Sequence, residues 1–167
     1  MTALPIDSYH FRNALGQFAT GVTIITTMAA DRCPVGVTAN SFTSLSLDPP
    51  LILWNLRQTS RSFPMFENSS RFAINVLSET QSDIAMNFAT RSFDRFQGVD
   101  WYEGAHGAPI IGGSLATFEC AHVAKYPGGD HAIFVGRVLA FQAGSGRPLL
   151  FFEGSFRELP KTESAFP

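Results

Sequence analysis

The strongest constraint on the fold is a succession of short apolar and β-branched segments that follow one another without regularly spaced helices. These segments span residues 22–28, 35–42, 51–56, 72–77, 115–126, 131–141 and 149–152. A parallel sheet needs a crossover helix between strands, whereas antiparallel strands are joined directly by turns. The pattern therefore predicts a mainly β chain with short helices: a closed antiparallel barrel of six or seven strands, with the helices packed outside.

Turn-forming residues separate several of these segments. Asp31–Arg32 joins the first two strands in an expected hairpin, and Pro127–Asp130 joins the two longest strands. Residues 91–113 instead combine glycines, aromatic residues and mixed charges, so we expect one long irregular connection there.

Two or three short helices are expected beside the barrel. Phe11, Leu15 and Phe18 recur at helical spacing on one face, with an N-cap at residue 7 or 8. The other candidate helices span residues 60–67 and 80–89.

The composition indicates that part of the surface does not face water. Charged residues make up 16% of the chain, below the usual ~25%, and there are 16 Phe against 2 Trp and 3 Tyr. Phe has no polar group that would favour exposure. With a length that suits one domain, these figures predict a buried subunit interface, a ligand slot, or both.

Charge and cysteine content exclude several partners. A net charge of −2 and a pI near 6.0 do not provide the positive charge that binding to nucleic acid or an anionic membrane requires. The longest uncharged run, residues 13–30, holds four Thr, an Asn, a Gln and two Gly, which argues against a membrane span. Cys33 and Cys120 cannot form a disulfide framework and no signal peptide is evident, so we expect a cytoplasmic protein with reduced thiols.

Sequence motifs remove further classes of function. No two histidines have the i, i+4 spacing of a zinc-binding helix, so no metal site is predicted. Cys120 and His122 share a strand face, which is expected of a core cysteine beside a packed histidine. The chain has no G-x-S-x-G nucleophile motif, and no P-loop or G-x-G-x-x-G follows a strand.

Three polar stretches beside apolar strands could carry a ligand site. Residues 36–46 abandon apolar alternation for Ser, Thr, Asn and small side chains, which suits either an edge strand or close approach of backbone groups to a planar heterocycle. Residues 55–62, with Asn55, Arg57 and several hydroxyls, suit an anion site or a plain helix cap. In residues 128–131 a tight turn needs Gly and Asp, while His131 opens a very apolar strand.

Taken together, these stretches resemble the short-chain flavin reductases, the reductase components of two-component flavin-dependent monooxygenases, within the FMN-binding split-barrel superfamily. The resemblance rests on Phe18-Ala-Thr-Gly-Val-Thr, on Ser41-Phe-Thr-Ser-Leu-Ser-Leu-Asp-Pro-Pro50, and on Gly129-Asp-His131. It continues through residues 60–64, 71–77, 81–89, 94–96, 119–120 and 148–150. It implies a single flavin reductase-like domain over residues 1–167, with a core of about 8–159 and a short flexible C-terminal tail.

The resemblance also implies which residues hold the flavin. Backbone groups of Thr38, Ala39, Asn40 and Ser41 would contact the isoalloxazine ring. The ribityl chain and phosphate would lie by Ser44, Ser46, Ser60, Arg61 and Ser62, in the stretch that also contains Asn55 and Arg57. Further flavin contacts are implied at Asn75, Val76 and Leu77, and Arg95 lies in a connection that shapes the site.

The implied activity is hydride transfer from NADH or NADPH to FMN or FAD, supplying reduced flavin to a partner oxygenase. His131 lies where the nicotinamide would approach, and the implied assembly is a homodimer with flavin near its seam. The alternative is a flavin- or haem-binding carrier or sensor without turnover. Gln58 departs from the basic residue common in relatives, which leaves Arg57 or Arg61 for the phosphate, and Phe151–Glu153 replace the usual Tyr, His or Arg.

The phenylalanines divide into two expected groups. Those expected to fill the barrel core are Phe18, Phe42, Phe72, Phe118 and Phe134, and those expected near the flavin and the dimer seam are Phe88, Phe93, Phe96 and Phe151.

Overall fold

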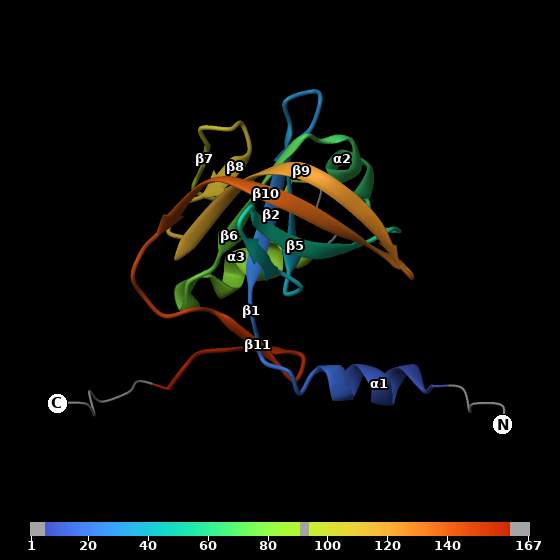
Figure 1. Cartoon of the computed structure of the whole chain (residues 1–167). Helices are drawn as coiled ribbons and strands as arrows, with labels where there is room; N and C mark the ends of the chain where they lie inside the picture. The colour runs from blue at the N-terminus through green and yellow to red at the C-terminus, as the bar shows by residue number, and fades with distance from the viewer. Residues whose placement is uncertain (1–5, 91–93, 161–167) are drawn as a thin grey trace.

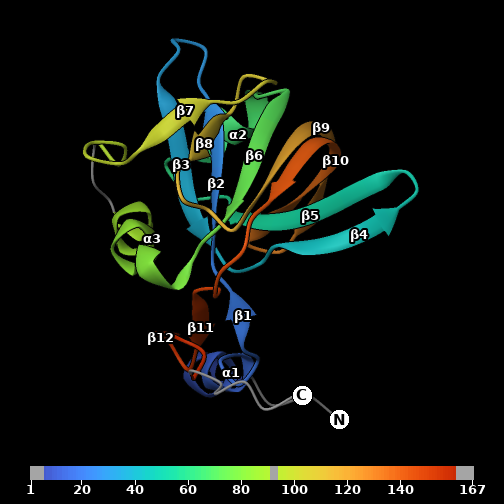
Figure 2. The same ribbon diagram turned by 90° about the vertical axis from the view of Figure 1, so that its left-hand side faces the viewer.

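The computed structural model describes residues 6–90 and 94–160, and its main element is a seven-stranded antiparallel sheet with the order β3-β2-β6-β9-β10-β5-β4. The strands are β2 Thr23–Met28, β3 Pro34–Ala39, β4 Thr43–Leu47, β5 Pro50–Arg57, β6 Arg71–Val76, β9 Ala116–Gly128 and β10 His131–Ala143. The sheet curls into a barrel, with β3 and β4 at its two edges (Figures 1 and 2). The predicted mainly β, antiparallel architecture is confirmed.

The register of the sheet places the end of β5 beside the start of β10. His131 pairs with Arg57 on one side and with Gly128 on the other. The β9–β10 hairpin therefore closes through a two-residue turn, Gly129–Asp130, in which Gly129 has a φ of 72°. A positive φ is readily adopted only by glycine, so the turn favours glycine at its first position, residue 129.

The barrel core is aromatic. Trp54 is fully buried, and its ring centroid lies 4.8 Å from that of Phe134 and 4.9 Å from that of Phe66. Phe72 is also buried, as the sequence predicted. Phe42 and Phe118 are half-buried and pack against the same cluster.

Helix α1, Ser8–Leu15, forms where the apolar spacing predicted it, and the Asp7 side chain caps it by accepting from His10 N at 2.8 Å. Its apolar face is nevertheless exposed, because the helix projects away from the barrel (Figure 1). The prediction that Phe18 fills the core is wrong: its side chain is 77% exposed. The spacing of the apolar residues predicted the helix, but it could not show whether the barrel covers its apolar face.

Two other helices pack against the barrel. Helix α2 is Phe63–Asn68, and helix α3 is Ser82–Ala89, preceded by a 3₁₀ turn, η1 Glu79–Gln81. Ser78 and Gln81 cap this turn reciprocally through side chain and backbone, which fixes where the helical segment begins. Phe88 and Ala85 bury the inner face of α3.

Part of the connection expected to be irregular is ordered as a strand pair. β7, Trp101–Glu103, pairs with β8, Pro109–Ile111. Two side chains of the barrel hold this strand pair in place. Asn75 Oδ1 accepts from Ile111 N at 2.9 Å, and the Glu119 carboxylate accepts from His106 N at 2.6 Å. These contacts come from distant positions, so the local pattern could not reveal the strands.

A three-stranded sheet joins the two ends of the described chain. It consists of β1 Thr20–Gly21, β11 Leu150–Phe152 and β12 Ser155–Arg157, in the order β1-β11-β12. It lies on the α1 side of the barrel (Figure 2). Phe93 and most of the tail expected after residue 159 fall outside the described residues. Within residues 6–90 and 94–160, no helix has the length and apolar character needed to span a membrane.

Candidate flavin site

Residues from all three predicted ligand stretches meet at one cavity of about 550 Å³. It lies where the end of β3, the end of β5, the β9–β10 hairpin and helix α3 converge. This volume falls within the range usual for small-molecule sites. The lining consists of Val37, Thr38, Ala39, Asn40, Ser41, Asn55, Leu56, Arg57, Ser60, Phe88, Ala89, Arg95, Gly128, His131 and Ile133.

One wall of the cavity is the end of β3, the edge strand of the main sheet. An edge strand has backbone N–H and C=O groups without a strand partner on one side. Thr38 Oγ1 donates to Ala85 O at 2.6 Å, which ties α3 to β3. Beyond the strand, Ser41 Oγ accepts from Asn55 N at 2.9 Å and donates to Asn55 O at 3.2 Å, joining this wall to β5.

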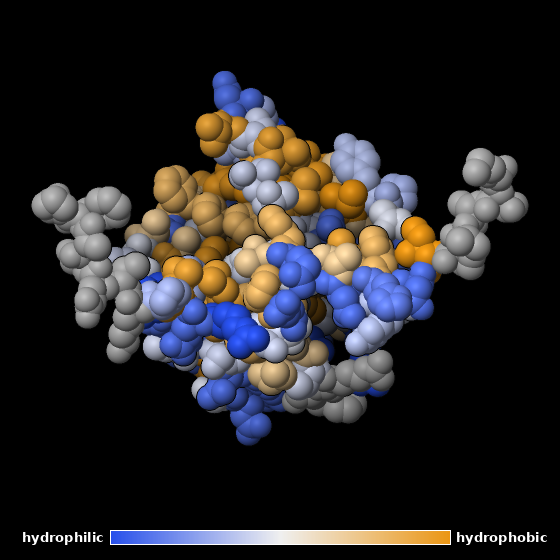
Figure 3. Space-filling view, turned by 90° about the horizontal axis from the view of Figure 1, so that it is seen from below, coloured by the Kyte–Doolittle hydropathy of each residue, from blue (hydrophilic) through white to orange (hydrophobic). Residues whose placement is uncertain are grey.

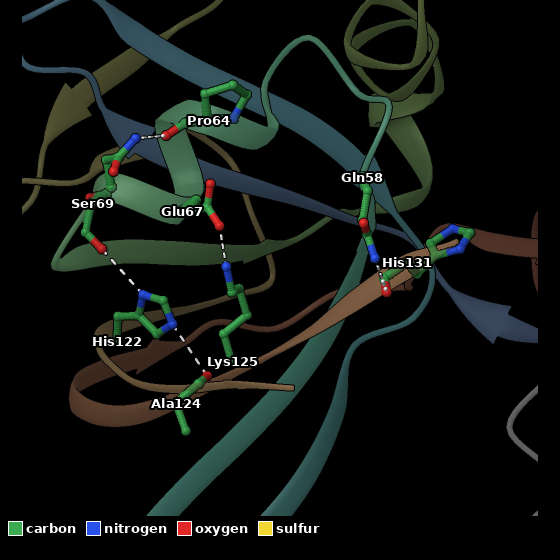
Figure 4. A network of polar contacts seen from close by, with 9 residues as sticks. Gln58, Pro64, Glu67, Ser69, His122, Ala124, Lys125 and His131 are labelled. Carbon is green, nitrogen blue, oxygen red and sulfur yellow. Dashed lines mark hydrogen bonds and ion pairs between the residues drawn. The ribbon is translucent and has the colours of Figure 1, made fainter. Parts of the chain in front are cut away.

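The opposite wall carries His131 and is clamped by Gln58 (Figure 4). Gln58 Nε2 donates to His131 O at 3.2 Å, as Figure 4 shows. It also donates to Gly129 O at 3.1 Å. Its backbone N–H donates to Asp130 O at 3.0 Å. The glutamine that stands in place of a basic residue thus fixes the turn before His131. Sequence reasoning noticed its unusual identity but missed this role.

The side chain of His131 is paired with Asp130. Asp130 Oδ1 lies 2.7 Å from His131 Nδ1, and Asp130 Oδ2 lies 3.7 Å from a guanidinium nitrogen of Arg57. The hydrogen bond to His131 is the main cause that lowers the pKa of the Asp130 carboxyl. Asp130 is therefore ionised at neutral pH and can only accept.

Arg95 forms the third wall through contacts with main-chain oxygens. Its guanidinium donates to Gly36 O at 2.8 Å and to Thr90 O at 2.6 Å, with a longer contact to Ser62 Oγ at 3.4 Å. Burial lowers the pKa of Arg95, and the nearby charge of Arg61 lowers it further. The arginine thus brings positive charge into a partly dry site.

Two polar side-chain atoms at the cavity lack partners. Asn55 Oδ1 and Arg95 Nε are shielded from solvent, and neither has a hydrogen-bond partner within the described structure. A buried polar atom without a partner costs about 1–3 kcal/mol, so a ligand bringing a hydrogen-bond donor and an anionic oxygen would relieve both. That combination fits a flavin nucleotide, which has a ring N–H and a phosphate.

The structure brings together nine of the residues proposed from the sequence. They are Thr38, Ala39, Asn40, Ser41, Asn55, Arg57, Ser60, Arg95 and His131. Arg61 and Ser62 line a neighbouring cavity, which Arg95 also borders. The cavity residues that sequence reasoning did not single out are Val37, Leu56, Ala89 and Ile133, whose apolar identities look like ordinary strand and helix packing.

Five residues proposed from the sequence lie away from the cavity lining. Ser44 and Ser46 are on β4, with Ser44 exposed. The Asn75 side chain is fully buried and donates to Ile24 O at 3.0 Å and to Thr26 Oγ1 at 3.2 Å. Val76 and Leu77 follow it on and after β6, and Leu77 belongs to the apolar cluster under α3.

The described residues contain no group of three His, Cys, Asp or Glu side chains that could hold a metal ion. What the cavity does offer is unpaired strand backbone, apolar surfaces at Phe88 and Ile133, two arginines and one oriented histidine. A curled antiparallel barrel with these groups at one cavity is suited to a planar, anionic ligand.

Comparison with known proteins identifies the family. The family model described as a flavin reductase like domain matches residues 15–160, so this chain belongs to that family. A probable flavin reductase of Rhizobium meliloti (strain 1021) is 47% identical over 156 residues, covering 93% of this chain and 50% of that protein. The chain thus spans about half the length of that relative.

Two further relatives match over most of their length. The flavin-dependent monooxygenase reductase subunit HsaB of Rhodococcus jostii (strain RHA1) is 45% identical, covering 93% of this chain and 80% of that protein. The solved structure of the Streptomyces globisporus C-1027 NADH:FAD oxidoreductase SgcE6, in complex with NAD and FAD fragments, matches with a TM-score of 0.90 and 38% identity. That match covers 97% of this chain and all of the SgcE6 chain, which confirms the flavin reductase split-barrel fold.

Proposed function

We propose that this protein is an NAD(P)H-dependent flavin reductase that transfers a hydride from a nicotinamide to FMN or FAD. The observation that carries the proposal is the meeting of the β3 edge, Asn55 and His131 at one cavity. The names of HsaB and SgcE6 support the same reaction class and the use of NADH and flavin. A carrier or sensor without turnover, the alternative, has no need of an oriented histidine beside the flavin cavity.

We propose that the flavin is held by backbone as much as by side chains. A bound flavin accepts the hydride at its N5 atom, and negative charge then develops near N1 and O2. N–H groups on the free edge of β3 and in the residues that follow it are suited to stabilise that charge because the strand fixes them before the reaction. The Asn55 amide oxygen would accept from the ring N–H, and Ser60 with Arg57 or Arg61 would hold the phosphate.

We propose that His131 orients the nicotinamide. Because the ionised Asp130 only accepts, the Nδ1 atom of His131 carries the hydrogen, and Nε2 of the neutral ring is an acceptor. The carboxamide N–H₂ of a nicotinamide is a matching donor. Such positioning accelerates hydride transfer by holding the two rings together rather than by side-chain chemistry.

We propose a homodimer, supported by exposed apolar surface on the α1 side. Figure 3 views the molecule from that side and shows hydrophobic residues gathered over much of the upper part of the view, with hydrophilic residues mostly across its middle and lower part. Leu15 and Phe18 are 59% and 77% exposed, and Leu47 on β4 is 93% exposed. Exposed apolar patches of this kind mark association surfaces. Sedimentation of a monomer at micromolar concentration would contradict the dimer.

We propose that the reduced flavin serves a partner oxygenase, as the name of HsaB indicates for that relative. Both cysteines of this chain are free thiols, Cys33 exposed and Cys120 buried. Free thiols are usual in a reducing compartment, so we place the proposed reaction in the cytoplasm.

The decisive experiment follows NADH and NADPH oxidation by absorbance, with and without added FMN, FAD or riboflavin. The reductase proposal expects oxidation that depends on flavin. A protein that binds flavin but never oxidises either nicotinamide would be a carrier. A His131→Ala variant should raise the KM for NAD(P)H and leave flavin affinity nearly intact, whereas equal loss of both would give His131 a structural role only.

A further inference from the structure

Two turns of the chain meet at the border of the flavin cavity. One follows β5, where Ser60 N donates to Arg57 O at 3.0 Å, so residues 57–60 close as a single hydrogen-bonded turn. The other is the β9–β10 turn, which is closed by the pairing of His131 with Gly128. The first and last residues of both turns line the cavity. A ligand in the cavity can therefore contact both turns at once.

Gln58 joins the two turns through three hydrogen bonds. Its backbone N–H donates to Asp130 O at 3.0 Å, and its side-chain Nε2 donates to Gly129 O at 3.1 Å and to His131 O at 3.2 Å. Figure 4 shows its side chain directed at the start of β10. Three consecutive carbonyl oxygens of the β9–β10 turn thus accept from one residue of the other turn.

The β9–β10 turn has little support from packing. Residues 125–130 are exposed, and none of them belongs to the hydrophobic clusters of the barrel. In the part of the chain that the structure describes, only one further side chain outside the hairpin contacts this turn through a hydrogen bond or an ion pair. It is that of Arg57, 3.7 Å from Asp130 Oδ2. Because a segment without buried apolar contacts is ordered mainly by its hydrogen bonds, the His131 turn depends on how firmly residues 57–58 are held.

A bound phosphate would hold residues 57–58 more firmly. Arg57 and Ser60, which are among the proposed phosphate ligands, are the first and last residues of the turn that contains Gln58. A guanidinium has five N–H donors, so Arg57 can contact a phosphate and remain beside Asp130. Charge-assisted hydrogen bonds at both ends of a four-residue turn restrict the backbone between them. Riboflavin has no phosphate and would leave the turn without these contacts.

We infer that Gln58 couples the two substrate sites, so that the phosphate of a bound flavin raises the affinity of the protein for its nicotinamide donor. This inference rests on the proposed function, because it requires the phosphate at Arg57 and Ser60 and the nicotinamide at His131. The phosphate restrains the first turn, and Gln58 passes that restraint to the second. Order supplied by one ligand lowers the entropic cost of binding the other. The coupling is reciprocal, so the nicotinamide strengthens the binding of phosphorylated flavin by the same factor.

The test measures how tetrahydro-NADH, an analogue that does not donate a hydride, changes the affinities for FMN and riboflavin. Both affinities are followed by quenching of flavin fluorescence. Stacking of the nicotinamide on the isoalloxazine ring affects the two flavins equally, so the difference between them isolates the phosphate. In the unmodified protein the analogue should strengthen FMN binding about fivefold more than riboflavin binding, at the lower end of the usual coupling range because the contacts are exposed.

The variant Gln58→Met keeps the length of the side chain and removes its amide donor. In this variant the analogue should strengthen the binding of the two flavins by nearly equal factors. The KM for NADH at saturating FMN should rise while kcat stays unchanged, whereas general damage to the fold would lower kcat as well. Gln142→Met is the matched control and should keep the full difference, since Gln142 is exposed near the far end of β10 and lies outside the flavin cavity.

Amide hydrogen exchange gives a second readout that does not depend on turnover. FMN should slow exchange in residues 128–131 more than riboflavin does, because only FMN restrains the turn that carries Gln58. Gln58→Met should remove this difference, and Gln142→Met should keep it.

The other outcomes contradict the inference. Equal strengthening of FMN and riboflavin in the unmodified protein would assign the coupling to ring stacking alone and overturn the inference while leaving the reductase proposal intact. A phosphate-dependent difference that survives Gln58→Met would place the coupling in other residues and overturn it as well. If no flavin binds and neither nicotinamide is oxidised, the proposed function fails, and the coupling fails with it.

Discussion

The Asp130 carboxylate lies 2.7 Å from Nδ1 of His131, at the turn that opens β10. The backbone of the same turn is held by Gln58, which directly follows β5, so the turn that carries both His131 and Asp130 is fixed in place. A histidine on a flexible loop would have to be ordered by its ligand, at an entropic cost. Here the ring is already constrained, which is what a positioning residue requires.

The first prediction concerns this pair. Asp130→Asn removes the charge that fixes the hydrogen on Nδ1 of His131, so the ring is free to adopt the other tautomer. We expect the KM for NAD(P)H to rise several-fold, with the affinity for flavin nearly unchanged. Asp83→Asn, an exposed acid in the first turn of α3, is the control and should behave as the unmodified protein. A parallel loss of flavin affinity would mean that Asp130 shapes the cavity itself.

The second prediction is the pH dependence of the pair. The pKa of Asp130 is lowered in the folded protein, chiefly by the hydrogen bond to His131. Its stabilising contribution is therefore complete above the unfolded pKa of about 3.9 and is lost as pH falls through the lower folded value. The Tm difference between the unmodified protein and Asp130→Asn should be present at neutral pH and shrink toward zero in acid. A difference that persists unchanged in acid would contradict the assignment.

The third prediction separates a structural role of Asn75 from the flavin contact expected by resemblance. Its amide bonds Ile24 O, Thr26 Oγ1 and Ile111 N inside the barrel. Asn75→Leu removes the side-chain partner of two buried main-chain groups, Ile24 O and Ile111 N, at about 1–3 kcal/mol for each group. Denaturant unfolding should therefore show a loss of several kcal/mol, whereas Asn68→Leu, whose amide bonds Pro64 O at the surface, should cost much less.

A flavin contact would give a different result for Asn75. Flavin affinity would then fall in Asn75→Leu even under conditions where the variant remains fully folded. Affinity measured well below the unfolding midpoint distinguishes the two cases.

Local patterning predicted the strands of the barrel because each one alternates or runs apolar between turn residues. The predicted strand at 131–141 becomes β10 over His131–Ala143, and the predicted strand at 51–56 becomes β5 over Pro50–Arg57. β4, Thr43–Leu47, was covered only by the edge-strand alternative for residues 36–46, because its Ser and Thr residues interrupt the apolar alternation. β4 forms because it pairs with β5, and the strand propensity of a residue does not include such tertiary pairing.

The candidate site was predictable where polar residues interrupt apolar strands, as at Thr38, Asn55 and His131. The contacts that Gln58 and Arg95 make were not predictable, because nothing in the sequence around these residues distinguishes them from ordinary surface residues. The Gln58 clamp depends on a main-chain turn 71 residues away, and Arg95 reaches Gly36 across 59 residues. Such contacts are set by how the barrel curls, and no local pattern of residues encodes them.

The last prediction uses the close packing of Gly36 against α3. A Cβ atom built at Gly36 would lie 2.4 Å from Cε1 of Phe88, and Phe88 lines the flavin cavity. Gly36→Ala must therefore push Phe88 outward, and overpacking of a core contact costs about 1–3 kcal/mol. Gly36 also supplies the carbonyl that holds Arg95, so a shift of β3 would displace this second residue of the cavity lining.

We accordingly expect Gly36→Ala to lower the unfolding free energy by about 1–3 kcal/mol and to weaken the binding of flavin. Gly21→Ala is the matched control, because a Cβ atom at Gly21 meets nothing within 4 Å. Unfolding in urea and fluorescence titration check the two effects separately. Loss of stability with unchanged flavin affinity would show that Phe88 moves away from the cavity rather than into it, and that the wall it forms tolerates displacement.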